Sequence, residues 1–377
     1  MASNYIHDDV AFSILSKLPI KSLKRFQCVH KSWSLLFEDS CFMTKYRNNF
    51  LSNAPYDGNT SLLIDLGNEL YSLSGDRFEN KFKLNWPNPF LEENTNFSIR
   101  YFGSANGILC LSYIGLYNYR DRRIVLWNPT IKKFKVVPPG HEVEFGASAT
   151  LYGFGYDRIA DDYKMIRHVK RQPLFQHLHN YVLSNKNSWA LPFWEIYNLR
   201  SNSWRTLDVN IPNSNIGIES PLNCNLQVYT NGMCHWVFDY FEGSLVSFDL
   251  NKEMVSITSV PSCITLYWPK LTLLNGSVAL VSSPKKATTF HISILGEIGV
   301  KESWIKLFIV EQSCVGFSIG VGMKGKIFIN KIDNEIVWFD LSTKMIKELG
   351  LKRKRTESQR VPIANIAIII KNLTCTF

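Results

Sequence analysis

The chain has 377 residues, 45% of them hydrophobic, so it can bury a sizeable core in one large domain plus a small module. Its formal net charge is +10. Residues 344–360 carry seven basic and two acidic side chains, a net charge of +5 that is half of the total. Charge elsewhere is mixed, no nucleic-acid-binding motif accompanies it, and no apolar run approaches the about twenty residues of a membrane helix, so we expect neither a nucleic-acid nor a membrane partner.

The cysteines and the first residues bear on the cellular compartment. The eight cysteines are scattered and form no CxxC pair. The polar segment around Asp8 and Asp9 lacks the pattern of a signal peptide. Both features predict free thiols in a reducing compartment, cytoplasmic and/or nuclear.

Residues 1–50 are predicted to form a small all-α domain of three short helices. Asp8 or Asp9 can cap the first helix, and Pro19 ends it because proline has no N–H and clashes with the preceding turn. Apolar residues then recur at helical spacing in three stripes: Val10, Ile14, Leu15 and Leu18; Ile20, Leu23, Phe26 and Val29; Trp33, Leu36 and Phe37. About forty residues cannot bury enough apolar surface to be stable alone, so we expect a partner to cover them.

This segment resembles the F-box family in its plant form. The matching residues are Ile14-Leu15, the run 18–26 (LPIKSLKRF), and then Val29, Lys31 and Trp33. Two positions depart from the family pattern: Ile6-His7 replaces the usual first Leu-Pro pair, and His30 stands where serine is frequent.

The resemblance implies docking onto a Skp-family adaptor and, through it, onto a cullin. Some residues of the stripes must instead build the core of the module, and the pattern does not separate the two groups. The alternative is a helical cap on the larger domain. The candidate adaptor-binding residues are Leu18, Pro19, Ile20, Leu23, Val29 and Trp33.

Residues 55–377 are predicted to be all-β, because short apolar runs alternate with Gly, Asn, Asp and Pro. A strand–polar turn–strand unit recurs around Leu70, Leu126, Ile196, Ser247, Ile292 and Trp338, at intervals of 56, 70, 51, 45 and 46 residues. This period suits the four-stranded blades of a propeller with about six blades. Asn-Gly pairs at 106–107, 231–232 and 275–276 predict hairpins, and a last strand near 363–370 is expected to close the ring on the first blade.

From about residue 100 to 345 the chain resembles the plant F-box-associated domain. The segments that carry the resemblance include residues 106–111 (NGILCL), 126–130 (LWNPT), 153–165, 231–236 and 299–307 (GVKESWIKL). The resemblance implies a kelch-like β-propeller that captures a protein for ubiquitination, without naming that target.

Motifs for cofactors and metals are weak. Gly320, Gly322 and Gly325 match GxGxxG, but the strand-like residues 326–329 follow where a dinucleotide-binding loop needs a helix. His177 with His179, and Cys234-His235, lack the second pair of ligands that zinc requires. The sequence therefore predicts no cofactor and no metal, and places Cys234-His235 in a core strand.

Three further features have competing interpretations. Adjacent Asp161 and Asp162 would point to opposite faces of a strand, which does not suit acid–base catalysis, and the resemblance to the F-box-associated domain implies a turn role for the pair. The run Lys352, Arg353, Lys354 and Arg355 is a possible nuclear signal or a solvated loop. The insertion at 170–192 is interpreted as a target-facing loop, and the alternative is a long connection that is merely tolerated.

These observations predict a non-catalytic substrate-recognition subunit of a Skp–cullin–F-box ubiquitin ligase. One alternative is an adaptor-bound scaffold that does not degrade its partner. A less favoured alternative is a propeller enzyme or a glycan-binding propeller, which requires convergent carboxylates or an aromatic platform at one mouth of the ring.

Overall fold

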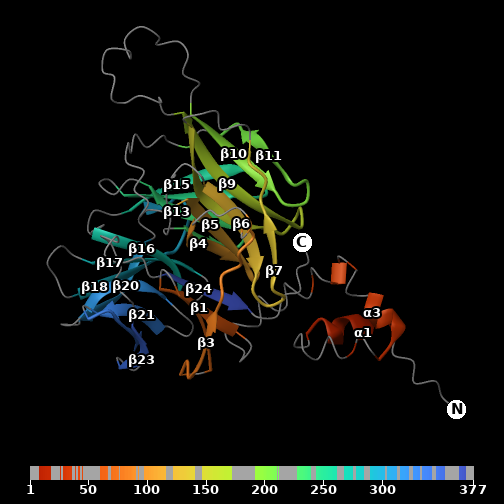
Figure 1. Cartoon of the computed structure of the whole chain (residues 1–377). Helices are drawn as coiled ribbons and strands as arrows, with labels where there is room; N and C mark the ends of the chain where they lie inside the picture. The colour runs from red at the N-terminus through yellow and green to blue at the C-terminus, as the bar shows by residue number, and fades with distance from the viewer. Residues whose placement is uncertain are drawn as a thin grey trace, which may run out of the picture.

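A computed structural model describes most of the β region and parts of the N-terminal segment (Figure 1). The described residues are 8–17, 26, 29–35, 39, 41–42, 45, 60–66, 69–75, 77–90, 92, 97–115, 122–140, 147–171, 192–209, 211, 227–238, 243–260, 267–274, 277–283, 289–301, 304–311, 315–321, 326–331, 333–341, 345–352 and 365–370. Among them, no helix is long and apolar enough to cross a membrane.

Two helices are described near the N-terminus, α1 (Asp8–Leu15) and α3 (Lys31–Leu35). Both coincide with predicted helical segments. Leu18, Pro19, Ile20 and Leu23 lie outside the described residues. The arrangement of three helices therefore stays a prediction.

The strands form six antiparallel sheets of four strands each, which confirms the all-β propeller with six blades. Blade 1 holds β24 (Asn365–Ile370), β1 (Thr60–Asp65), β2 (Leu70–Ser74) and β3 (Asn80–Leu84). Blade 2 holds β4 (Phe97–Ala105), β5 (Ile108–Gly115), β6 (Arg122–Asn128) and β7 (Lys133–Val136). Blade 3 holds β8 (Ala147–Asp157), β9 (Asp162–Arg171), β10 (Phe193–Asn198) and β11 (Ser203–Leu207). Blade 4 holds β12 (Gln227–Thr230), β13 (Met233–Phe238), β14 (Ser244–Asp249) and β15 (Met254–Ser259). Blade 5 holds β16 (Tyr267–Leu274), β17 (Ser277–Ser283), β18 (Thr289–Leu295) and β19 (Trp304–Glu311). Blade 6 holds β20 (Val315–Val321), β21 (Lys326–Lys331), β22 (Glu335–Asp340) and β23 (Ile346–Lys352).

The innermost strand of each blade lines the middle of the ring. These strands contact one another in succession, in the order β24, β4, β8, β12, β16 and β20. The ring closes as predicted. Strand β24 pairs with β1 from Thr60↔Ile370 to Asp65↔Asn365, so blade 1 combines both ends of the β region. A strand follows the glycines of the GxGxxG match, as predicted, because β21 begins at Lys326.

Two predicted Asn-Gly hairpins are confirmed. Asn106 and Gly107 have φ of 47° and 80°, and Asn231 and Gly232 have φ of 51° and 79°. A type I′ turn needs positive φ at both central positions, which asparagine and glycine adopt at low cost. The pair at 275–276 lies outside the described residues.

Each blade is buried on both of its faces by its neighbours. In β1, Leu63 packs against Leu109 and Leu111 of blade 2, whereas Leu62 and Ile64 pack in a cluster shared with blade 6. Successive side chains of a strand point to opposite faces, so the central residues of a strand between two neighbours, here Leu62 to Ile64, are apolar on both faces. This burial on both faces explains the continuous apolar run of β1.

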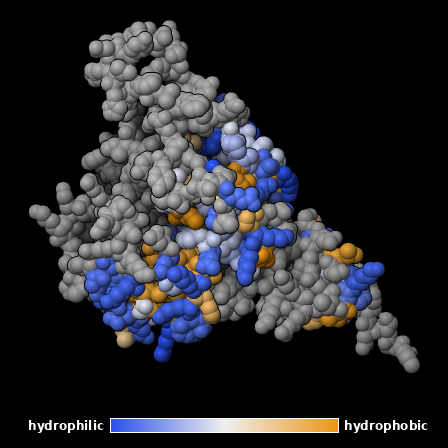
Figure 2. All heavy atoms as spheres, in the orientation of Figure 1, coloured by the Kyte–Doolittle hydropathy of each residue, from blue (hydrophilic) through white to orange (hydrophobic). Residues whose placement is uncertain are grey.

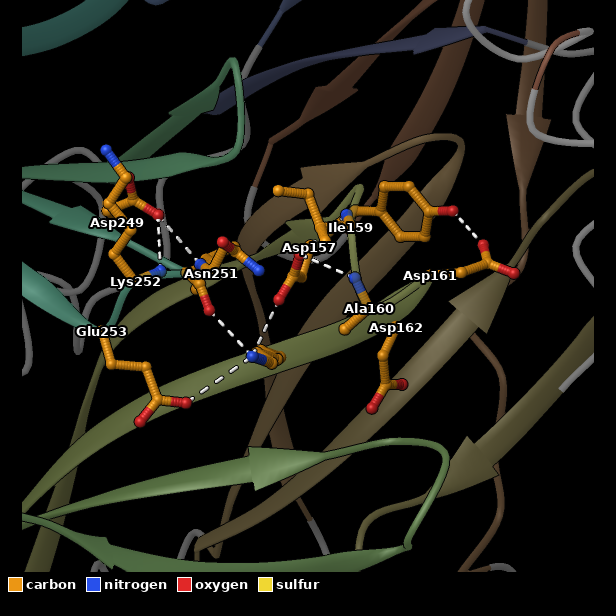
Figure 3. A network of polar contacts seen from close by, with 12 residues as sticks. Asp157, Ile159, Ala160, Asp161, Asp162, Asp249, Asn251, Lys252 and Glu253 are labelled. Atoms are coloured by element: carbon orange, nitrogen blue, oxygen red, sulfur yellow. Dashed lines mark hydrogen bonds and ion pairs between the residues drawn. The ribbon is translucent and has the colours of Figure 1, made fainter.

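A buried polar network links blades 3 and 4 (Figure 3). The Lys164 Nζ lies 2.9 Å from Oδ2 of Asp157 and 3.6 Å from Oε1 of Glu253, and it donates to the Leu250 carbonyl at 2.8 Å. Burial raises the pKa of Asp157, but Lys164 and the amides of Ala160 and Ile159 outweigh burial, so the pKa is lowered overall. Through Leu250 and Glu253, Lys164 thus joins β9 to the β14–β15 turn.

We expect removal of β24 to open the ring. A chain truncated before Asn365 loses the ladder of β24 with β1, and about six hydrogen bonds at about 1 kcal/mol each make the loss on the order of 5 kcal/mol. Urea unfolding measures it. A chain ending at Ile370 is the matched control and keeps wild-type stability; equal stability of the two truncations would contradict the role of β24.

We expect Lys164→Met to lower the free energy of unfolding by about 3 kcal/mol at neutral pH, because Asp157 stays buried without its cation. In the wild type the folded-state pKa of Asp157 is lowered, so its stabilisation is present above pH about 4 and disappears as pH falls through that pKa. The difference between variant and wild type should therefore shrink in acid. Urea unfolding across pH tests this, with the exposed Lys252→Met as control; a difference independent of pH would refute it.

Candidate functional site

Helix α1 carries an open apolar face. Ala11 and Leu15 are buried, whereas Val10 and Ile14 are 51% and 52% exposed. The Phe12 ring meets Phe42 edge-on at 5.1 Å, so one side of α1 packs inside the N-terminal segment. Two branched aliphatic side chains on the other side remain available for a partner.

The described residues after α1 also expose apolar side chains. Val29 is 66% exposed and Leu35 is 60% exposed. Trp33 is half-buried, with its ring 5.8 Å from that of Phe26 and 5.7 Å from that of His30. Among the predicted adaptor-binding residues within the described part, Val29 is therefore on the surface and Trp33 contributes to packing.

The sequence prediction did not select Val10, Ile14 or Leu35 for binding. Val10 and Ile14 belong to the first predicted stripe, but the 3.6-residue period alone does not say which edge of a stripe is covered. Leu35 lies outside the predicted stripes. The remaining predicted residues, Leu18, Pro19, Ile20 and Leu23, lie outside the described ones.

The propeller has two unlike faces. One, here the short-turn face, holds tight connections such as 106–107, 158–161, 231–232 and 250–253. The opposite face, here the long-connection face, holds longer ones such as 172–192 and 208–226. Thr60 opposes Ile370 at the short-turn face, where β24 ends and β1 begins. The chain therefore enters and leaves the propeller on the same face.

The predicted target-facing insertion belongs to the long-connection face. It joins Arg171, the last residue of β9, to Phe193, the first of β10. Residues 172–191 lie outside the described ones, so their role stays a prediction.

The Asp161-Asp162 pair serves a turn (Figure 3). Asp161 accepts a hydrogen bond from the Tyr156 hydroxyl and has a φ of 53°. Asp162 accepts from the Arg200 amide at 2.9 Å. Both carboxylates bind groups of their own blade, so the arrangement supports the turn interpretation over acid–base catalysis.

Cys234 and His235 are core residues of β13, as predicted. Cys234 is fully buried, and His235 is 1% exposed with its Nδ1 2.8 Å from the Ser247 hydroxyl. Burial lowers the pKa of His235 to about 4, so the ring is neutral at neutral pH. Within the described part of the chain, no group of three or more His, Cys, Asp or Glu could hold a metal ion. His177 and His179 lie outside it.

The predicted nuclear signal is only partly placed. Lys352 is exposed and ends β23. Arg353, Lys354 and Arg355 follow outside the described residues. A role for this run in import stays a prediction.

Comparisons with known proteins agree with this architecture. The model of the F-box associated beta propeller domain matches residues 62–372. An F-box/kelch-repeat protein of Arabidopsis thaliana is 25% identical over 302 residues, which cover 78% of this chain and 76% of the relative. The F-box protein CPR1 of Arabidopsis thaliana is 23% identical over 379 residues, covering 91% of this chain and 84% of CPR1.

Among solved structures, TolB from Acinetobacter baumannii aligns at 11% identity and a TM-score of 0.48, covering 85% of this chain and 70% of TolB, values too low to bear on function. The family match, in contrast, spans all six blades, from β1 to β24. This chain belongs to the family of proteins with an F-box associated beta propeller domain.

Proposed function

We propose that this protein is the substrate-recognition subunit of a Skp–cullin–F-box ubiquitin ligase. Residues 1–50 dock onto a Skp-family adaptor that binds the cullin, and residues 55–377 hold a target protein. The observation that carries the proposal is the open apolar surface of the N-terminal segment, joined to a closed propeller. The exposed apolar side chains of this segment include Val10, Ile14, Val29 and Leu35.

The energetics favour a stable partner for this surface. Each of these four side chains is at least half exposed. Complete burial of a valine or leucine side chain contributes about 1.5–3 kcal/mol, so even partial burial of all four is worth several kcal/mol. A segment too short to bury a core of its own gains this stabilisation only through a partner.

The layout of the propeller supports separate binding surfaces for adaptor and target. The N-terminal segment joins β1 at the short-turn face, whereas the longer connections lie on the opposite face. We assign target binding to the long-connection face, with residues 172–192 as a contributor. The protein then acts by proximity and orientation, and the chemistry belongs to the other subunits.

The compartment follows from the same proposal. Adaptor and cullin binding place the protein in the cytoplasm and/or the nucleus. Lys352, Arg353, Lys354 and Arg355 are the residues proposed to direct nuclear import.

We expect Val10→Asp with Ile14→Asp to weaken binding to a purified Skp-family adaptor by at least about tenfold, because both changes put charge into an apolar contact. Leu18→Ala with Pro19→Ala should have the same effect if those residues also face the adaptor. Surface plasmon resonance with immobilised adaptor measures the affinity. Ile159→Asp is the matched control, since Ile159 is 79% exposed on the propeller. Unchanged affinity of the Val10 and Ile14 variant would refute the assigned surface.

Target turnover distinguishes a ligase receptor from an adaptor-bound scaffold. Proximity labelling with the proteasome blocked identifies the bound target. Cycloheximide chase then compares its half-life with and without this protein, and we expect a longer half-life without it. A target that stays bound but keeps the same half-life would support the scaffold instead.

A further inference from the structure

Two tryptophans in the junction between blades 3 and 4 have buried indole nitrogens without a partner. Trp194 on β10 is 6% exposed and Trp236 on β13 is 3% exposed. Neither Nε1 has a hydrogen-bond partner in the structure. In contrast, Nε1 of Trp204, also in blade 3, donates to the carbonyl of Pro138 at 2.9 Å. An indole N–H is a donor only, and buried donors are almost always paired, so the two nitrogens point to an acceptor from outside the chain.

His168 brings a third such nitrogen to the same junction. It lies opposite Trp194 in the pairing of β9 with β10, and the two ring centres are 4.7 Å apart. Its Nε2 is buried and has no hydrogen-bond partner. The ring centres of Trp194 and Trp236 are 6.3 Å apart, and the Tyr152 ring lies 4.9 to 6.4 Å from all three. Tyr152, His168, Trp194 and Trp236 form the blade 3–4 aromatic cluster.

The blade 3–4 aromatic cluster lies toward the long-connection face. Strand β9 ends at that face with Arg171, three residues after His168. Strand β10 begins there one residue before Trp194, and β13 ends there two residues after Trp236. The cluster is therefore in the half of the junction next to the face assigned to the target.

A cation lies beside the cluster. Lys170 is two residues beyond His168, so both side chains leave the same face of β9, and Lys170 is only half-buried. Burial, and after it the charge of Lys170, lower the pKa of His168 to about 4. The imidazole is therefore neutral at neutral pH, and it can carry its proton on Nε2 and donate from there. Three N–H donors and one ammonium group thus belong to one end of the junction.

The opposite end of the same junction shows how the chain pairs a buried cation internally. There Lys164 has the carboxylate of Asp157 at 2.9 Å and that of Glu253 at 3.6 Å. At the long-connection end, the nitrogens of the aromatic cluster have no such acceptor. A carboxylate fits these groups, because it accepts several hydrogen bonds at once and is attracted by Lys170.

Other kinds of partner group fit this end of the junction less well. A phosphate group carries more charge and typically meets a cluster of arginines. Arg167, next to His168 in β9, leaves the other face of the strand and is paired with Glu195. In the view of Figure 2, hydrophobic side chains on the described propeller surface are scattered among hydrophilic ones. A polar contact therefore suits the surface better than a broad apolar one.

We infer that the blade 3–4 aromatic cluster binds a carboxylate of the target protein, which enters past the half-buried Tyr152 and Lys170. The carboxylate oxygens accept from the three unpartnered nitrogens of the cluster, and Lys170 supplies the opposite charge. The inference rests on the proposed function, because it places a recognition element for the target at the long-connection face. It also gives that face a chemical preference.

NMR titration of the full chain with isotope-labelled tryptophan tests the inference. The probe is propionate, which has the same end as a glutamate side chain, and propionamide is its neutral control. We expect propionate to shift the indole N–H signals of Trp194 and Trp236 downfield with one shared affinity, because both gain an acceptor. Propionamide should shift them far less. Trp304 is the internal control, because its buried Nε1 is also unpartnered but lies in the junction between blades 4 and 5.

Single variants measure each contribution through the signal that remains. Trp194→Phe, read at Trp236, should weaken propionate binding at least about fivefold, the equivalent of one hydrogen bond, and Trp236→Phe, read at Trp194, should do the same. Trp304→Phe is the matched control and should change the affinity less than about twofold. Lys170→Gln should also weaken binding, whereas the exposed Lys252→Gln on the short-turn face should not. Urea unfolding verifies that each variant is folded.

Two further probes identify the source of the carboxylate. N-acetylglutamate α-methylamide carries it on a side chain, and N-acetylleucine carries it at a chain end; binding of either supports the inference. Equal shifts with propionamide, the same shift at Trp304, or unchanged affinity of the Trp194 and Trp236 variants would overturn it. So would the absence of any shift, which would mean that water alone satisfies the nitrogens. Such a failure leaves the proposed function standing, because adaptor binding and target half-life are measured independently.

Discussion

Everything in the propeller depends on the apolar contact between neighbouring blades. A single four-stranded sheet here carries apolar residues on both faces, so it is unstable in water until both faces are covered. Strand β1 shows this directly, with Leu63 facing blade 2 and Leu62 and Ile64 in the core shared with blade 6. A closed ring is the arrangement that gives every blade two neighbours. The proposed target site uses what this closure leaves exposed, the connections at the long-connection face.

Polar interactions supplement that packing where blades meet near the short-turn face. Lys164 reaches the carbonyl of Leu250 and the carboxylate of Glu253, both in the next blade. Arg205 of β11 also pairs with Glu253. In blade 3 itself, the buried Arg167 pairs with Glu195, and its guanidinium lies 3.9 Å from the Trp204 ring centre. The contacts of Lys164 use a buried charge to fix how blades 3 and 4 meet, which apolar contact alone specifies less sharply.

Local sequence signals predict the β architecture. Alternating and continuous apolar runs, Asn-Gly pairs and a recurrent spacing each act over a few residues, and together they predicted six blades, two described hairpins and closure by the last strand. Long-range contacts left no such signal. No residue near Lys164 indicates a partner 86 residues away, and no local pattern indicates that Phe12 packs against Phe42 while Val10 stays exposed.

The closure of the ring has a consequence for the order of events during synthesis. Blade 1 cannot be completed until Ile370 has left the ribosome, whereas its partner strand begins at Thr60. Until then the array of intervening blades keeps an apolar face exposed to solvent at its open end. Pairing of β24 with β1 across so long a stretch of chain is slow. The N-terminal helices emerge long before that moment. A nascent chain can thus meet the partner of its first fifty residues before it has any finished surface for a second one, which makes early capture of that segment a natural safeguard against aggregation.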